Sequence, residues 1–466
     1  MRPDEQLPPI ALTARDAANV YLESDRAPAN IVSVSIVDAA ALDIDEAAVI
    51  SWLRDRLDCS PIFRRKLQRA FADVIYPSWV ADPAFDAGNH VTVVHASDWA
   101  GAEPVIQSLV ASRMDLSRPP WDLTVIGGIR GLGDGLPDRA TALVFRFHHS
   151  IGDAVVTAAT VRRMLTATPE PAPVPPSSAR RNPLVSVLRA PLDLAMYVRA
   201  IVTAPKLTQA AAAGDSNPAG LDPVVTRFNR RLEGVPTVGL VHFGLDDIRA
   251  VRAAVEGATV NDVVLTVVSG ALSSLLTRLD GPVNGPLVAT MPIAVNDGAG
   301  TANKFALGCV NLHADVDDPV ERLRQIHATT AAEKVRQQHP ALAEHRSLPN
   351  SIPAYVTRIV GWKSRRSTAA PPASHVTMIS NVPSRMTDAT FMGAPVVDRF
   401  GFPTLSDGGG LAHGVSSIEP ILALTFTADS AALPDAAEYE ALLRESFAEL
   451  ASKAANSLRG ERESSS

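Results

Sequence analysis

The sequence predicts an α/β protein with two domains. Helical and strand-like apolar patterns mix in both halves of the 466-residue chain, and this length suits two domains of ordinary size. A proline-rich stretch over residues 168–183 cannot hold a helix and separates the halves. We expect an N-terminal domain, a linker with bridging helices, a C-terminal domain and a disordered tail, at 1–170, 171–235, 236–458 and 459–466 respectively.

Composition agrees with two folded cores and limits the possible partners. Apolar residues make up 46% of the chain and charged residues 20%, as in globular domains. The net charge of -7 and the isoelectric point of about 5.9 argue against nucleic acid as the main partner, because phosphate binding needs a basic surface.

The same composition suggests a cytoplasmic protein. Cys59 and Cys309 have neither metal-ligand spacing nor the pattern of a disulfide framework, which suits a reducing compartment. The first nine residues are polar and contain prolines, unlike a signal peptide. No uninterrupted apolar run reaches about 18 residues, so we expect any membrane contact to be peripheral.

In the N-terminal half, apolar residues alternate in some segments and recur at helical spacing in others. The predicted strands are 31–37, 91–95, 123–129 and 140–147. The predicted helices are 12–24, 44–57, 103–114 and 154–165. Thr13 and Asp153 stand where a side chain would cap the first turn of a helix.

The C-terminal half shows the same mixture. The predicted strands are 240–243, 287–295, 375–379, 394–400 and 422–427. The predicted helices are 245–255, 262–279, 318–335 and 436–455, with Asn261 as the cap of the second. Residues 364–374 are expected to have little regular structure. Residues 184–213 predict amphipathic helices that either bridge the domains or lie on a lipid surface.

The segment His148–Asp153 (HHSIGD) carries the clearest chemical signal. It directly follows a predicted strand, whose end is a rigid support for a catalytic side chain, and histidine exchanges protons near neutral pH. We predict that His149 accepts the proton of an attacking hydroxyl, which accelerates acyl transfer by about 10²–10⁴-fold. The alternative is that His148 and His149 are structural hydrogen-bonding groups. Asp153 is expected to fix the turn and the helix start, and no third good ligand stands nearby to complete a metal site.

Three further segments could contribute to a site. The amide of Asn261 could donate to a developing oxyanion, which is typically worth about 10²–10³-fold in turnover, or could merely cap its helix. Trp121, within Arg118–Asp122 (RPPWD), suggests core packing when taken alone. The glycines at 408–410 permit close approach of the backbone to a ligand, or a tight turn. The sequence has no GxSxG elbow, Walker loop or dinucleotide fingerprint, which argues against the common hydrolase, NTPase and Rossmann classes.

Taken in order, these segments resemble the bacterial wax ester synthase/diacylglycerol acyltransferase family over nearly the whole chain. The family motifs LSPxDAxFLxxE, FRxRL, WVxDPxFD, RPLWE/D, HHxxxDG, NDVVLA and SNVPGP have counterparts at residues 12–23, 63–67, 79–86, 118–122, 148–154, 261–266 and 380–384. HHxxxD alone is shared by a wider superfamily, whereas the combination is specific to this family.

The resemblance implies a fold like chloramphenicol acetyltransferase: two α/β domains with mixed sheets flanked by helices, and an active site at their interface. It implies an O-acyltransferase that uses acyl-CoA as co-substrate, needs no cofactor, and acylates diacylglycerol, a long-chain alcohol or both. The enzyme would meet these acceptors at a membrane or lipid droplet. The expected catalytic residues are His149, His148, Asp153 and Asn261. The expected substrate-binding residues are Pro119, Trp121, Gly152, Asp262, Gly408 and Gly410.

Some positions depart from the family pattern. Ala154 replaces the closing glycine of HHxxxDG, Pro120 replaces the middle residue of RPLW, and Ala412 replaces the asparagine of a GxGLN segment. Ala302 and Ala306 replace glycines, and Ser417 replaces a tyrosine. These departures leave two alternatives: an acyltransferase that uses a carrier protein or another alcohol, and a weakly active or non-catalytic lipid-binding relative.

Overall fold

The computed structural model describes most of the chain. The described residues are 7–38, 44–133, 135–173, 223–295, 305–339, 352–367, 374–382 and 388–464, with short pieces within 189–199 and at 342, 369 and 386. The predicted linker and bridging helices therefore lie largely outside the described residues.

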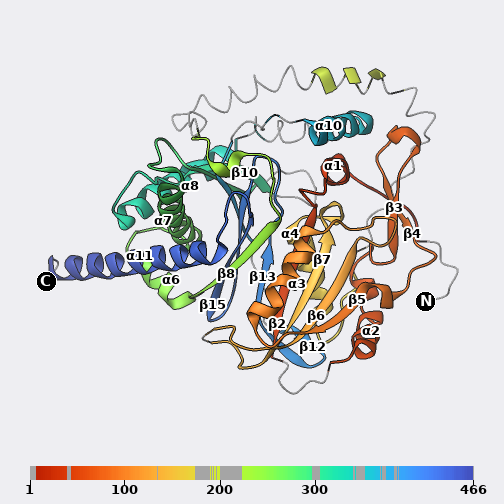
Figure 1. Cartoon of the computed structure of the whole chain (residues 1–466), viewed down its shortest axis with the longest axis horizontal. Coiled ribbons are helices and arrows are strands. Elements are labelled where there is room, and N and C mark those ends of the chain that lie inside the picture. Colours follow the sequence, from red (N-terminus) through yellow and green to blue (C-terminus); the bar gives the residue numbers. More distant parts are fainter. Residues whose placement is uncertain are drawn as a thin grey trace. The chain divides into compact units, whose positions relative to one another are not determined.

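The chain forms two compact units with mixed α/β structure (Figure 1). Unit 1 contains residues 1–204, 347–368 and 384–404, and unit 2 contains 205–346, 369–383 and 405–466. The prediction that 236–458 forms one C-terminal domain is wrong, because two segments of this range belong to unit 1. One supplies a helix and the other supplies strands, and local sequence patterns do not reveal such distant pairing.

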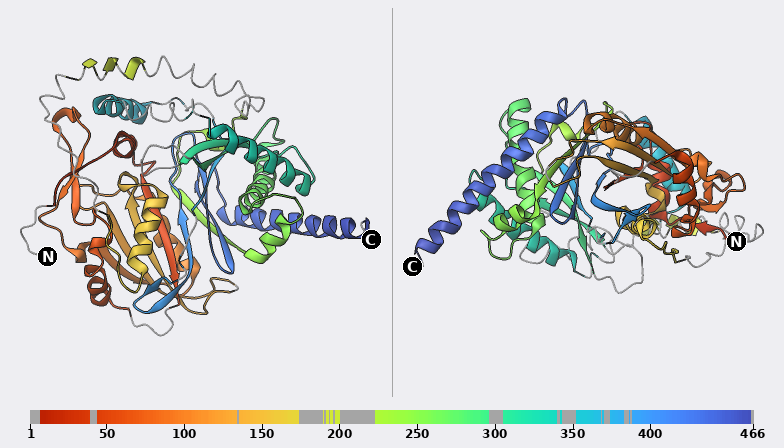
Figure 2. Two further views of the ribbon diagram at one scale, coloured as in Figure 1. Left: turned by 180° about the vertical axis from the view of Figure 1, so that it is seen from behind. Right: turned by 90° about the horizontal axis from the view of Figure 1, so that it is seen from below.

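Unit 1 is built on a six-stranded sheet in the order β12-β13-β2-β7-β6-β5. The strands in that order are Thr390–Phe391, Ala394–Phe402, Asn30–Val37, Ala140–His148, Trp121–Ile129 and Val91–His95. Only β5 and β6 pair in parallel. Helix α3 (Trp99–Ala111) crosses the sheet in Figure 1 and α4 (Ala154–Leu165) crosses it in the reverse view of Figure 2, so both faces are covered. This covering explains why β2 and β7 are buried along almost their whole length.

A smaller layer in unit 1 surrounds helix α1 (Ala14–Leu22), which Thr13 caps as predicted. The short strands β1 (Ile10–Ala11), β4 (Ser78–Ala81) and β3 (Arg65–Gln68) form a second sheet beside it. Leu12, Ala17, Tyr21, Ile62 and Trp79 make the small core between them. Helix α10 (Ala354–Arg366) packs against α1, and α2 (Glu46–Arg54) packs near β5.

Unit 2 has a six-stranded sheet in the order β10-β9-β11-β14-β15-β8. The strands in that order are Phe305–Asn311, Val288–Ala294, Thr377–Asn381, Leu411–Ile418, Ile421–Asp429 and Pro236–Gly244. β11 pairs in parallel with both neighbours, and the other pairs are antiparallel. The helices gather on one face of this sheet (Figure 1); they are α6, α7, α8 and α11, at Leu245–Arg252, Val260–Asp280, Pro319–Gln337 and Ala436–Ser464.

Helix α7 is the centre of the unit 2 core. By length and composition alone it could cross a membrane, but 67% of its most apolar window is buried in the fold, as in the core helix of a globular protein. Its N-cap is Thr259, whose hydroxyl and backbone N–H both pair with the Asp262 carboxylate. The prediction that Asn261 caps this helix is therefore wrong, because the helix begins two residues earlier.

Most predicted elements are confirmed within a few residues, but two predictions of irregular structure are wrong. Residues 364–366 end helix α10, and residues 459–464 continue helix α11. The short strands β1, β3, β4 and β12, the longer β10 and β14, and most of α10 had no predicted counterpart.

Candidate active site

The HHSIGD segment forms a fixed turn between β7 and α4. Strand β7 ends at His148, a short 3-10 helix, η4, spans His149–Ile151, and α4 begins at Ala154. Gly152 has φ +152°, and a Cβ there would lie 2.6 Å from Cγ1 of Val156, so the position requires glycine. Oδ1 of Asp153 accepts hydrogen bonds from the backbone N–H groups of Val155 and Val156, both at 3.0 Å, which confirms the predicted N-cap.

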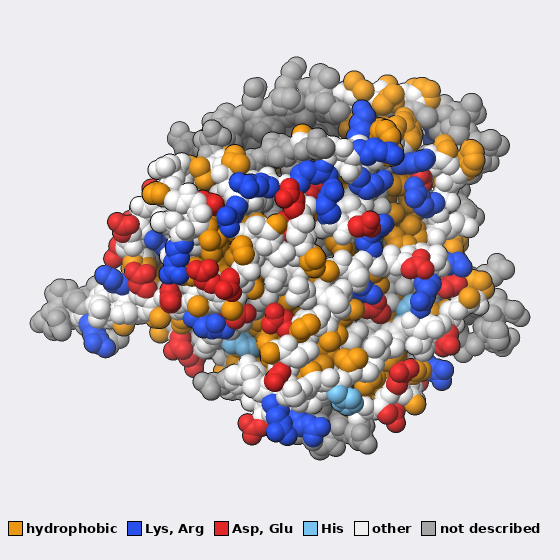
Figure 3. Space-filling model, in the orientation of Figure 1, with side chains coloured by type: hydrophobic (Ala, Val, Ile, Leu, Met, Phe, Trp, Pro, Cys, Tyr) orange, Lys and Arg blue, Asp and Glu red, His pale blue; other side chains and the backbone are white. Residues whose placement is uncertain are grey.

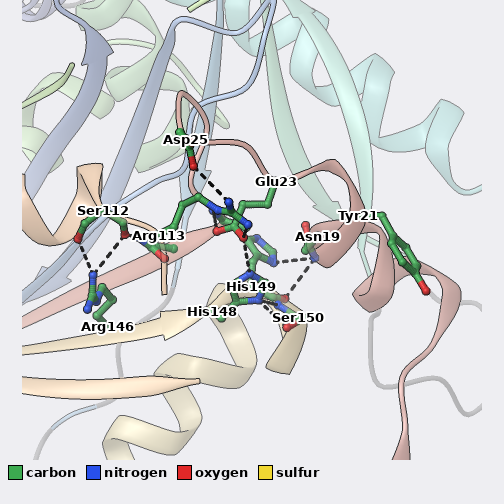
Figure 4. A network of polar contacts seen from close by, with 12 residues as sticks. Asn19, Tyr21, Glu23, Asp25, Ser112, Arg113, Arg146, His148, His149 and Ser150 are labelled. Carbon is green, nitrogen blue, oxygen red and sulfur yellow. Dashed lines mark hydrogen bonds and ion pairs between the residues drawn. The ribbon is translucent and has the colours of Figure 1, made fainter. Parts of the chain in front are cut away.

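Figure 4 shows the amide of Asn19, on α1, beside His149, whose backbone is also held by Ala29 and by Gly152 of the same turn. The N–H of His149 donates to the carbonyl of Ala29 at 2.7 Å. Its carbonyl accepts from the amide of Asn19, on α1, at 3.3 Å and from the N–H of Gly152 at 3.4 Å. The Asn19 amide nitrogen also lies 3.5 Å from Nδ1 of the His149 ring. The ring is half-buried, and the backbone of His149 is held by the loop before β2, by the turn at Gly152 and by helix α1.

The surroundings of His149 favour its neutral form. Burial lowers the pKa of His149 below its usual value, although a hydrogen bond to its own backbone carbonyl and the charge of Asp153 act in the opposite direction. A histidine whose pKa is depressed is unprotonated at pH 7 and can accept a proton. This environment is the one that a general base requires.

His148 is a positioning residue. Its ring is fully buried, and its N–H donates to the carbonyl of Pro120 at 3.0 Å. Nδ1 accepts the N–H of Ser150 at 3.2 Å, so the ring proton of the neutral form lies on Nε2, which is 3.6 Å from Oε2 of Glu23. Direct catalysis by His148 stays a prediction, and the contacts of its buried ring are with Ser150 and Glu23.

Glu23 connects both histidines. Its side chain is 1% exposed, and Oε2 pairs with Arg113 at 3.1 Å while Oε1 accepts the N–H of Ala29 at 3.1 Å (Figure 4). Burial opposes ionisation of Glu23, but the His148 ring, the Ala29 N–H and Arg113 together lower its pKa. Because Ala29 also accepts the N–H of His149, one carboxylate faces His148 and fixes the loop that holds His149.

The sequence-based site missed Glu23 and Asn19. Glu23 matches the final glutamate of the LSPxDAxFLxxE motif, so the family resemblance was the signal that could have found it. Asn19 lies on a helix next to apolar residues, and only the fold shows that its amide points to His149.

We expect Glu23→Ala to lower the free energy of unfolding by about 2–3 kcal/mol, because it leaves Arg113, His148 and a backbone N–H without their shared acceptor. Asp25→Ala is the matched control, since Asp25 also pairs with Arg113 but is 93% exposed, and we expect a change within about 0.5 kcal/mol. Urea unfolding of both variants measures the difference. Equal destabilisation by the two substitutions would contradict the role of Glu23.

The RPPWD segment packs beside the HHSIGD turn and bonds to its first residue. Pro119 and Pro120 are buried, and the Pro120 carbonyl holds His148. Trp121 is 1% exposed, stacks on His90 with ring centroids 4.6 Å apart, and donates Nε1–H to the carbonyl of Phe63 at 3.0 Å. Both side chains are enclosed by protein, and the substrate contacts of Pro119 and Trp121 stay predictions.

In unit 2, the neighbouring residues Asn261 and Asp262 differ in their burial and in their hydrogen bonds. Asn261 is half-buried in the first turn of α7, and its amide lies 3.7 Å from the Met291 sulfur. Asp262 is fully buried and bonds to Thr259, to Thr330 at 2.7 Å and to Nδ1 of His327 at 2.9 Å. The substrate-binding role of Asp262 stays a prediction, and both of its carboxylate oxygens are bonded within the protein. The oxyanion role of Asn261 stays a prediction.

The glycines at 408–410 pack against the protein's own backbone. The N–H groups of Gly408 and Gly410 donate to the carbonyls of Arg230 and Phe228, at 2.9 and 2.8 Å. Gly408 has φ +84°, which a residue with a side chain rarely adopts. Substrate binding by Gly408 and Gly410 stays a prediction, although their N–H groups are already bonded within the protein. Among the described residues, no group of three His, Cys, Asp or Glu side chains is placed to hold a metal ion.

Comparison with protein families matches two domain models along the chain. The catalytic domain of wax ester synthase/diacylglycerol acyltransferase matches residues 12–264, and the C-terminal domain of the same family matches residues 301–451. The first match contains the HHSIGD turn and the start of α7.

Individual relatives agree with these matches. A Mycobacterium tuberculosis protein, named provisionally as a diacylglycerol O-acyltransferase, is 29% identical over 438 residues, which are 87% of this chain and 88% of the relative. Another protein of that organism with the same provisional name is 25% identical over 445 residues, covering 91% of this chain and 86% of the relative.

Solved structures share the fold. The wax ester synthase/diacylglycerol acyltransferase from Marinobacter aquaeolei VT8 aligns with a TM-score of 0.67 at 20% identity, over 96% of this chain and 100% of that one. The trichothecene 15-O-acetyltransferase TRI3 from Fusarium sporotrichioides aligns with a TM-score of 0.55 at 11% identity, over 96% and 94%.

Proposed function

This chain belongs to the wax ester synthase/diacylglycerol acyltransferase family, and from that membership we propose that it transfers a fatty acyl group from acyl-CoA to an alcohol oxygen. The acceptor would be diacylglycerol, which gives triacylglycerol, or a long-chain alcohol, which gives a wax ester. We propose a cytoplasmic enzyme that works at the surface of the inner membrane or of lipid droplets, where such apolar acceptors reside.

One observation carries this proposal: His149 is half-buried, its backbone is fixed by Ala29, Asn19 and Gly152, and its pKa is depressed. An alcohol is too weak an acid to ionise at neutral pH, so its proton must leave as the new bond forms. A neutral imidazole held in one place supplies that acceptor without first losing a proton itself.

The proposed reaction uses His149 twice. The acceptor hydroxyl oxygen attacks the thioester carbonyl carbon while the His149 imidazole takes the hydroxyl proton, and a tetrahedral oxyanion forms. The carbon–sulfur bond then breaks, and the imidazolium gives its proton to the departing CoA thiolate. The products are an ester and free CoA, so the step balances with acyl-CoA as co-substrate. Asn261 is proposed as a donor to the oxyanion.

The deciding experiment is an acceptor panel. Purified protein receives radiolabelled palmitoyl-CoA with diacylglycerol, hexadecanol or a water-soluble short-chain alcohol, and the labelled esters are separated by thin-layer chromatography. We expect ester with at least one long-chain acceptor. If ester forms only when the palmitoyl group is supplied on a carrier protein, or with none of the acceptors, the acyl-CoA proposal is wrong.

A further inference from the structure

Helix α10 packs against unit 1 with the side of the helix that carries its smallest residues. Its buried positions are Ala354, Thr357 and Gly361. A Cβ at Gly361 would collide with the backbone carbonyl of Tyr21, so the glycine lets α10 approach α1 very closely. Arg365 also donates to that carbonyl. The helix is thus fixed to α1 without burying Ile359, Val360 or Trp362.

Those large side chains face outward instead. Ile359, Val360 and Trp362 are each 51% exposed on α10. Phe71, in the adjoining 3-10 helix η2 (Phe71–Asp73), is 91% exposed. Arg358 of α10 ties the two segments together by donating to the carbonyl of Ala72 at 3.3 Å and pairing with Asp73 at 3.4 Å. We call these four apolar side chains the α10 face. Such exposure of Trp and Phe costs free energy in water unless something covers them.

Basic side chains surround the α10 face. Arg358, Lys363, Arg365 and Arg366 are all exposed, and the guanidinium of Arg366 lies 4.2 Å from the centre of the Trp362 ring. No aspartate or glutamate occurs between Glu344 and Asp388, although the whole chain has a net charge of -7. Figure 3 shows Lys and Arg side chains gathered with apolar ones at the upper right, where α10 lies in Figure 1.

We propose that the α10 face docks on an anionic lipid surface. The exposed apolar and aromatic side chains would enter the headgroup region, and Lys363 and Arg366 would pair with lipid phosphates. This proposal extends the proposed function and rests on it. It names the surface through which the enzyme would reach acceptors that are held in lipid. The segment first expected to contact lipid, 184–213, lies largely outside the described residues.

Binding to vesicles tests the proposal without any substrate. Full-length protein is floated with vesicles of phosphatidylcholine alone or mixed with phosphatidylglycerol. We expect binding mainly to the anionic vesicles. Lys363→Gln with Arg366→Gln should weaken it by about fivefold for each charge removed, and Ile359→Ser with Trp362→Ser by about tenfold or more. The matched control is Val335→Ser on α8, since Val335 is 73% exposed and lies between Lys334 and Arg336. Equal binding by all variants, or equal binding to both kinds of vesicle, overturns the proposal.

Trp362 provides a direct readout of the contact. All five tryptophans are in the described part of the chain, and Trp362 is the one that is exposed. We expect anionic vesicles to shift tryptophan emission to shorter wavelength in the wild type and not in Trp362→Phe. If iodide fails to quench Trp362 in lipid-free protein, another part of this chain or a second copy already covers the face, and the proposal is overturned.

Activity separates this proposal from the proposed function. The Ile359→Ser/Trp362→Ser variant should lose transfer to diacylglycerol in anionic vesicles but keep transfer to the water-soluble short-chain alcohol. Loss with both acceptors would overturn the docking role. Vesicle binding by wild-type protein that makes no ester with any acceptor would support docking and overturn the proposed function.

Discussion

Replacement of His149 by alanine is expected to lower kcat for acyl transfer by about 10²–10⁴-fold, because the attacking hydroxyl then lacks a positioned proton acceptor. The ring is half-buried and forms no bond on which the fold depends, so the thermal midpoint should change little. Ester formation from labelled palmitoyl-CoA measures the loss. His95→Ala is the matched control, since His95 is exposed at the end of β5 in the same unit. Undiminished transfer by His149→Ala would rule out this residue as the base.

The pH profile offers a second test of the same assignment. A base works only when unprotonated, and burial lowers the pKa of His149 below its ordinary value of 6.5. The acid limb of kcat/KM should therefore lie below pH 6.5, with activity constant above it until other groups titrate. An acid limb above pH 6.5 would contradict the lowered pKa of His149, because it would require the protonated ring to be stabilised in the free enzyme.

His413 should make unit 2 sensitive to acid. Its ring is fully buried between β14 and α11, where Nδ1 lies 2.8 Å from the Thr377 hydroxyl and Nε2 lies 3.0 Å from the Tyr439 hydroxyl. Burial lowers the pKa of His413 to about 3. The ring is thus neutral when folded, whereas the unfolded chain binds a proton below pH 6.5. Its contribution to stability is complete above pH 6.5 and is lost as the pH falls toward 3.

Between pH 8 and pH 5, His413 alone should remove about 2 kcal/mol from the free energy of unfolding, given about 1.4 kcal/mol per pH unit once the pH is below 6.5. Urea unfolding at the two pH values measures the loss. His413→Gln cannot titrate, so its stability should fall by about 2 kcal/mol less over the same interval, even if it is less stable at pH 8. His95→Gln, at an exposed site, serves as the control. An unchanged pH dependence in His413→Gln would show that the buried ring does not cause it.

Local patterns predicted the elements that carry strong periodicity. The strand at Ala140–His148, the Asp153 cap and α4 were expected almost to the residue, because alternating apolar residues followed by a capped helix leave few alternatives. Strands as short as β1 or β3 lack such a pattern. Helix α10 was missed because its buried positions are small and its outward positions are apolar, which reverses the usual pattern of a surface helix.

For a similar physical reason, the sequence predicted some residues of the site and missed others. The turn of His149, Gly152 and Asp153 is local, and sequence spacing was sufficient to find it. Glu23 acts through contacts with residues about 90 and 125 positions away, and spacing holds no trace of such contacts. Trp121, Asp262 and the 408–410 glycines occupy family motifs, and in the fold they make packing and capping contacts that the motifs do not specify. A motif identifies a position that matters and not the reason for it.

The pairing of β13 with β2 has a consequence for synthesis of the protein on the ribosome. Strand β2 ends at Val37 and its outer neighbour begins at Ala394, so one edge of the unit 1 sheet stays open until nearly the whole chain has emerged. At about 5–20 residues per second, that interval lasts roughly 20–70 s. An apolar edge strand left unpaired for so long invites pairing with other nascent chains. Because of this one long-range strand pair, we expect one of two outcomes. Either a chaperone protects the open edge during translation, or the sheet closes only after the chain leaves the ribosome.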